Sequence, residues 1–167
     1  MAVKYKHSNT NSMYYCTFTC YNWMNLISNT NSYDLVYNWF NVLKESSIET
    51  VAYVIMPNHV HCILYFPDEN FELNKILSNG KRFMAYEIIN RLEQQGDKDI
   101  LLILANALTE REKKKGQKHK VFKDSFDAKA IYSDHFFMQK LNYIHNNPVT
   151  GRWNLAKDYI SYEHSSA

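Results

Sequence analysis

The stretch Met56-Pro57-Asn58-His59-Val60-His61-Cys62-Ile63-Leu64-Tyr65-Phe66 decides how this chain folds. Its Pro-Asn pair favours a turn, and the apolar, β-branched and aromatic residues that follow favour a strand. Because side chains alternate along a strand, His59 and His61 are expected on the same face of the sheet. Two imidazoles at that spacing can share a metal ion. The simpler interpretation is two unrelated histidines at the start of a strand.

The flanking residues predict three more strands. Residues 49–56 form a strand that pairs with the histidine strand through the Pro-Asn turn, as a β-hairpin. Residues 13–21 alternate, with Tyr14, Cys16, Phe18 and Cys20 on one face and the more polar Tyr15, Thr17, Thr19 and Tyr21 on the other. A fourth strand is expected from Ala128 to Tyr132.

Helical periodicity fills the intervening segments. A loop over residues 22–32 precedes a helix that Ser32 or Asp34 can cap and that runs to about Lys44. A second long helix starts at residues 68–70 and ends near Gln95-Gly96, with a kink or break at Asn79-Gly80. Residues 99–108 are helical. Ser133 caps a last helix that must stop before Pro148.

The order of these elements predicts an α+β fold: a ferredoxin-like four-stranded antiparallel sheet with the two long helices on one face. In that topology the first strand and the histidine strand are central neighbours. The extra C-terminal helix is free to pack near the other face, carrying Tyr143 toward the histidines. Residues 1–167 are expected to form a single domain, with the charged region 96–120, which holds Lys113-Lys114-Lys115, as an insertion.

Composition sets broad limits. The 167 residues are 46% hydrophobic, enough for a core, and the formal net charge of +2 neither demands nor excludes nucleic acid. The three cysteines, an odd number, look like small core residues in a reducing cytosol. The longest dense apolar run, Ile100 to Leu104, is far too short to span a bilayer. Lys4, Lys6 and His7 belong either to a frayed terminus or to a basic arm that touches phosphates.

Three segments resemble the HUH family of single-tyrosine transposases, and most closely the REP-associated tyrosine transposases and their insertion-sequence relatives. Asn58-His59-Val60-His61 resembles the family's His-hydrophobic-His motif. Tyr143-Ile144-His145-Asn146-Asn147-Pro148-Val149 resembles the segment with its nucleophilic tyrosine. Asp158-Tyr159 with Tyr162 and Ser165-Ser166-Ala167 resembles its C-terminal signature.

The resemblance implies a mechanism. His59 and His61 would bind Mg²⁺ or Mn²⁺, and Tyr143 would attack single-stranded DNA to leave a 5′-phosphotyrosine and a free 3′-hydroxyl. Asn147, one helical turn after Tyr143, would be the third metal ligand, with Gln139 in reserve. On residues alone, Tyr143 is one tyrosine among 13, and His145 is structural or DNA-facing. Lys81 and Arg82 are candidate DNA-backbone contacts or simply a solvated helix surface.

The expected partner is single-stranded DNA with hairpin ends, handled in a bacterial cytoplasm in association with the nucleoid. Relatives act as monomers or as homodimers, and the sequence leaves the oligomeric state open. Two other function classes remain. One is a metal-dependent phosphodiesterase that uses water as the nucleophile. The other is a non-catalytic binder of single-stranded nucleic acid on a ferredoxin-like sheet.

Overall fold

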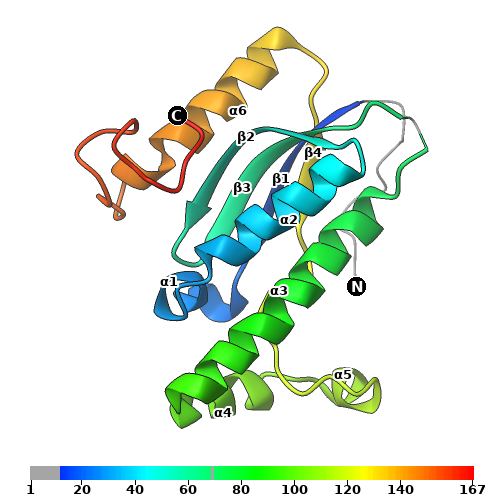
Figure 1. Ribbon diagram of the computed structural model, residues 1–167, viewed down its shortest axis with the longest axis vertical. Helices are drawn as coiled ribbons and strands as arrows, with labels where there is room; N and C mark the ends of the chain where they lie inside the picture. The colour runs from blue at the N-terminus through cyan, green and yellow to red at the C-terminus, as the bar shows by residue number, and fades with distance from the viewer. Residues whose placement is uncertain (1–11, 69) are drawn as a thin grey trace.

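The computed structural model describes residues 12–68 and 70–167, and the proposed basic arm at Lys4, Lys6 and His7 lies outside them. Within this part of the chain four strands form one antiparallel sheet in the order β2-β3-β1-β4 (Figure 1). The strands are β1 (Met13–Thr19), β2 (Glu49–Met56), β3 (His59–Tyr65) and β4 (Asp127–Ala130). The expected α+β architecture is therefore confirmed, with β1 and β3 as central neighbours.

The β2–β3 hairpin has the predicted two-residue turn. Met56 pairs with His59, so Pro57 and Asn58 alone connect the strands. The fourth strand is displaced from its expected position: it pairs with β1 from Asp127 to Ala130, and Tyr132 is exposed beyond its end. The chain at Tyr132 has already left the sheet and approaches the next helix.

Two long helices, α2 (Tyr33–Glu45) and α3 (Leu73–Gln95), cover one face of the sheet, hereafter the α2/α3 face (Figure 1). The sheet contributes apolar side chains to this core, namely Tyr14, Cys16, Phe18, Val60, Cys62 and Leu64. The helices contribute Val36, Trp39, Leu43, Leu77, Met84, Ile88 and Leu92. This apolar layer is the main hydrophobic core of the described residues.

The expected kink at Asn79-Gly80 is wrong, because α3 is one continuous helix from Leu73 to Gln95. Gly80 serves packing between helices instead. A Cβ atom added there would lie 2.5 Å from Nε1 of Trp39, on α2. The glycine lets α3 approach the indole ring closely, and that benefit outweighs its low helix propensity.

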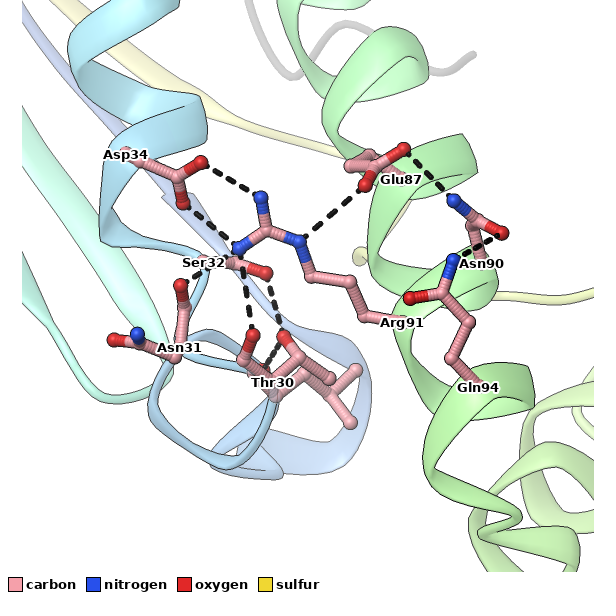
Figure 2. Close-up of polar contacts among 9 residues, drawn as sticks. Thr30, Asn31, Ser32, Asp34, Glu87, Asn90, Arg91 and Gln94 are labelled. Carbon is pink, nitrogen blue, oxygen red and sulfur yellow. Dashed lines mark hydrogen bonds and ion pairs between the residues drawn. The ribbon is translucent and has the colours of Figure 1, made fainter.

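Arg91 ties α3 to the start of α2 (Figure 2). Its guanidinium donates to both carboxylate oxygens of Asp34, at 2.8 and 2.6 Å, and to the carbonyl oxygen of Asn31, at 2.7 Å. Glu87, one turn earlier on α3, accepts from Nε at 3.4 Å. The hydrogen bonds from Arg91 hold the pKa of the Asp34 carboxyl below its usual range. The bidentate pair fixes the relative position of the two helices.

The segment expected as a loop contains the 3₁₀ turn η1 (Tyr21–Trp23) and the short helix α1 (Leu26–Asn29). Burial of Leu26 and Ile27 and two backbone hydrogen bonds to the Pro57 carbonyl stabilise α1. After α3 come α4 (Lys98–Asn106) and α5 (Glu110–Lys114). That residues 96–120 are an insertion, and that the chain forms a single domain, both stay predictions. No helix among the described residues is long and apolar enough to cross a membrane.

The opposite side of the sheet, hereafter the α6 face, is covered by α6 (Asp134–Asn146) and the 3₁₀ turn η2 (Asn147–Val149) (Figure 1). Ser133 caps α6 as expected, accepting a hydrogen bond from the Phe136 amide. The buried apolar cluster here is small and comprises Tyr15, Ala52, Val54, Met56, Ile63 and Ile144.

The C-terminal tail lies along the edge of β2. The Ile55 amide donates to the His164 carbonyl at 2.8 Å, and the Ser166 amide donates to the Tyr53 carbonyl at 3.0 Å. The Tyr162 hydroxyl also donates to the Ile55 carbonyl. The tail thus satisfies backbone groups on the open edge of the sheet.

Candidate active site

The histidine pair lies on the α6 face, away from α2 and α3. Val60, Cys62 and Leu64 point into the α2/α3 core, so the intervening His59 and His61 point to the other side. Their ring centroids are 4.7 Å apart. The two residues are only 4% and 6% exposed, which is uncommon for histidine.

Burial keeps both imidazoles neutral. It lowers the pKa of His59 to about 4, with the Arg152 cation contributing in the same direction. The pKa of His61 falls well below its usual value because of burial and the nearby His59 and Lys140. Neutral imidazoles at neutral pH are the form that can donate a lone pair to a metal ion.

Asn58 holds His59 in place. Its Nδ2 atom donates to the Trp23 carbonyl at 2.7 Å, and its Oδ1 atom lies 2.7 Å from Nδ1 of His59. The rings of Trp23 and Trp153 flank the imidazole, with centroids 5.6 and 5.7 Å away. A hairpin-turn residue therefore both closes the turn and orients the first histidine.

Two hydroxyl groups of β1 hold His61. The Tyr15 hydroxyl lies 2.7 Å from Nδ1, and the Thr17 hydroxyl lies 2.6 Å from the same atom. Thr17 is the direct cross-strand partner of His61 in the β1–β3 register. The other ring nitrogen, Nε2 of His61, is buried and has no hydrogen-bond partner.

Tyr143 lies on α6 against the second histidine. Its ring centroid is 5.2 Å from that of His61, with the ring planes at 77°. Half of the residue is exposed, so a substrate can reach it. The Lys140 ammonium lies over the rings of Tyr15 and Tyr143, 4.9 and 5.8 Å from their centroids. A half-exposed phenol, a cation and a buried imidazole therefore share one location.

Asn147 lies beside His59. The residue is buried, and its side chain raises the pKa of His59, which opposes part of the lowering caused by burial. By distance and angle, however, its Oδ1 atom has no hydrogen-bond partner. Gln139, the reserve candidate for a third ligand, is exposed. His145 forms a hydrogen bond with Ser166 through Nε2 at 3.2 Å, and whether its role is structural or DNA-facing stays open.

The donor set fits a small divalent cation, although no group of three or more His, Cys, Asp or Glu side chains in residues 12–68 and 70–167 could hold one. The unpartnered atoms Nε2 of His61 and Oδ1 of Asn147 are what a ligand would satisfy. Two imidazoles and one amide oxygen would leave coordination positions for phosphate oxygens, which Mg²⁺ commonly takes from its substrate.

The two proposed DNA-backbone contacts lie on α3, across the sheet from this site. Lys81 is 7% exposed, and its ammonium donates to the carbonyl oxygens of Lys123 and Asp124. Burial lowers its pKa to about 8. In this conformation the Lys81 ammonium supports the chain before β4, and its contact with DNA stays a prediction. Arg82 is exposed over the Phe83 ring, and its contact with DNA stays a prediction.

The sequence interpretation did not single out Tyr15, Thr17, Asn58 or Lys140 as parts of the site. The polar side of the first strand was noticed, and pairing that side with the histidine strand would have suggested Thr17. Lys140 precedes Tyr143 by three residues, a spacing that places both on one side of a helix. The cross-strand register, which depends on tertiary pairing, was the missing information.

Comparison with solved structures gives two related folds. A REP-associated tyrosine transposase bound to a REP hairpin is similar over 99% of this chain and 82% of its own, with TM-score 0.67 and 16% identity. A protein from Deinococcus radiodurans R1, provisionally assigned as a transposase, is similar over 87% of this chain and 95% of its own, with TM-score 0.50 and 14% identity. No protein-family model and no curated protein matches the chain. At these identities the similarity concerns the backbone: the chain has the fold of the REP-associated tyrosine transposase structure.

Proposed function

We propose that the protein is a DNA transposase of the HUH single-tyrosine kind, which cuts and rejoins single-stranded DNA through a phosphotyrosine on Tyr143. The observation that carries this proposal is the position of Tyr143: a half-exposed phenol that lies against one of two buried, neutral histidines. The sequence motifs and the fold of the solved transposase structures point to the same chemistry.

The chain's own residues can run the reaction as follows. The Tyr143 oxygen attacks the scissile phosphorus and loses its proton. The new phosphorus–oxygen bond replaces the bond to the 3′-oxygen, which takes up a proton and leaves as a hydroxyl. Attack by a 3′-hydroxyl on the phosphotyrosine reverses these steps and joins the strands. The Lys140 cation, 5.8 Å from the centroid of the Tyr143 ring, would stabilise negative charge that develops during the attack.

His59, His61 and Asn147 would hold Mg²⁺ or Mn²⁺ beside Tyr143. The ion would neutralise charge on the phosphate oxygens. The burial of both histidines excludes water from this side of the site and keeps them neutral.

The proposed partner is single-stranded DNA that carries a hairpin, by analogy with the hairpin bound to the similar transposase. Two aromatic rings paired with cations flank His59 and suit such a strand: Lys123 lies over Trp23, and Arg152 lies over Trp153. A bacterial, nucleoid-associated location and assembly as a homodimer belong to the same proposal and rest on the family resemblance alone.

The test is a covalent adduct. We expect incubation with single-stranded DNA from the flanking locus and Mn²⁺ to give a protein–DNA band that survives a denaturing gel, with the phosphate mapped to Tyr143 by mass spectrometry. Tyr143→Phe should eliminate the band while leaving stability and DNA binding nearly unchanged. Tyr132→Phe is the matched control, because Tyr132 is 79% exposed and packs on Phe136 away from the histidines. An adduct on another tyrosine would show that the assignment is wrong.

His59→Ala and His61→Ala should abolish cleavage and leave most DNA binding intact, because other cations supply phosphate contacts. If DNA is cleaved without any covalent adduct, and the Tyr143→Phe variant still cleaves it, the result would favour a phosphodiesterase that uses water. DNA binding that neither chelator nor these variants affect, with no cleavage, would favour a non-catalytic binder.

A further inference from the structure

A neutral histidine can bind a metal ion only through the ring nitrogen that carries no proton, so its tautomer matters. At this site each ring has a defined neighbour at Nδ1. Asn58 lies 2.7 Å from Nδ1 of His59, and the hydroxyls of Tyr15 and Thr17 lie 2.7 and 2.6 Å from Nδ1 of His61. These neighbours determine where the proton resides.

The His59 tautomer follows from the orientation of the Asn58 amide. The Trp23 carbonyl can only accept a hydrogen bond, so the Asn58 atom that faces it, at 2.7 Å, is the amide nitrogen. The atom that faces His59 is then the amide oxygen, which also only accepts. Nδ1 of His59 must therefore carry the proton, and Nε2 keeps its lone pair.

The His61 tautomer follows from its unpartnered nitrogen. A hydroxyl either donates or accepts, so Tyr15 and Thr17 satisfy Nδ1 in both tautomers. The buried Nε2 atom has no partner, and a proton there would be an unpaired buried N–H. Orphaned donors of that kind are rarer than unpaired acceptors. The arrangement with the lower cost has the proton on Nδ1, donated to one of the two hydroxyls.

We propose that Asn58 and the Tyr15–Thr17 hydroxyl pair hold both histidines in the Nδ1–H tautomer, so that each Nε2 atom keeps a lone pair ready for a metal ion. Asn58, Tyr15 and Thr17 are positioning residues that act through the histidines. The link to a metal rests on the proposed function, whereas the tautomers are a property of the protein alone. Removing partners of this kind typically lowers metal affinity about 10–100-fold.

The experiment measures tautomers in the metal-free, DNA-free protein. Long-range ¹H–¹⁵N spectra of protein labelled with ¹⁵N-histidine distinguish the two nitrogens of each ring, and His59→Gln and His61→Gln assign the signals. We expect both wild-type rings as Nδ1–H. The double variant Tyr15→Phe with Thr17→Val keeps the shape of both side chains, and it should release only His61 into a tautomer mixture. Asn58→Leu should release only His59.

The second readout is Mn²⁺ affinity by titration calorimetry, which should fall about 10–100-fold in the double variant and in Asn58→Leu. Tyr14→Phe is the matched control: it removes a phenol from the neighbouring position of β1, on the α2/α3 face, and should change neither readout. An Nε2–H signal for either wild-type ring, or tautomers and affinity unchanged in the variants, would overturn the proposal. Correct tautomers without any phosphotyrosine adduct would instead count against the proposed function.

Discussion

Alternate residues of β3 lie in two different environments on the two faces of one sheet. On the α2/α3 face, Val60, Cys62 and Leu64 pack into a continuous apolar core between the sheet and two long helices. On the α6 face, His59 and His61 are buried beside a small apolar cluster and beside polar groups of β1 and η2. The same strand thus contributes to two layers with different contents.

The difference separates stability from binding. Burial of apolar surface on the α2/α3 face is the dominant favourable term in folding. The α6 face instead buries neutral histidines and leaves Nε2 of His61 and Oδ1 of Asn147 without partners. Unpartnered buried polar atoms cost free energy, so at this face a ligand that satisfied these two atoms would stabilise the folded protein.

The largest expected effect is on the apolar side of β3. Leu64→Ala should lower the free energy of unfolding by about 3 kcal/mol, because it leaves a cavity in a fully buried core. Urea denaturation would measure it, with Val51→Ala as the exposed control on β2. Adduct formation per folded molecule should stay near the wild-type value. A loss of stability below 1 kcal/mol would show that the two faces contribute more equally than we infer.

The second effect is a pH dependence that arises on the polar side. Folding lowers the pKa of His59 to about 4, so between pH 6.5 and 4 the unfolded chain binds the proton that the folded chain excludes. The contribution is fully present above pH 6.5 and is lost as the pH falls toward 4. From pH 7 to pH 5 we expect wild type to lose about 2 kcal/mol more stability than His59→Gln. Parallel curves for the two proteins would mean that His59 is not buried neutral.

The smallest effect on stability should come from Asn147→Ala, despite the burial of this residue. Its Oδ1 atom makes no hydrogen bond, so we expect its loss to change the free energy of unfolding by less than about 1 kcal/mol. Mn²⁺ affinity should fall, with partial rescue of cleavage at high Mn²⁺. Asn142→Ala, an exposed change on α6, is the control for both measurements. A strongly destabilised Asn147→Ala protein would assign the residue to packing.

Local patterns in the sequence predicted much of this architecture. Strand alternation together with the β-α-β-β-α order placed the histidines on the face opposite the long helices, because the side-chain period of a strand is fixed. Prediction failed where tertiary packing decides. From sequence Gly80 predicts a break in the helix, whereas the structure shows that it makes room for the Trp39 ring. Lys81 has the sequence pattern of a surface cation, whereas its ammonium donates to a backbone carbonyl.

In the candidate site, too, local patterns predicted some residues and tertiary packing determined the others. The spacing of the histidines pointed to His59 and His61, the family resemblance pointed to Tyr143, and the fold brings all three together. The groups that orient His61 come from the neighbouring strand β1, and their identity depends on the β1–β3 register. Those contacts join residues more than 40 positions apart, such as Thr17 and His61, which no local pattern reports.

The C-terminal tail on the edge of β2 has a consequence for association with other molecules. An unprotected strand edge offers a row of amide and carbonyl groups to any extended chain, and it is a common starting point for aggregation. Here Ile55 and Tyr53 already bond His164 and Ser166. Two copies could extend their sheets across this edge only after both tails had been displaced. The tail therefore protects the edge of β2 against sheet-to-sheet growth.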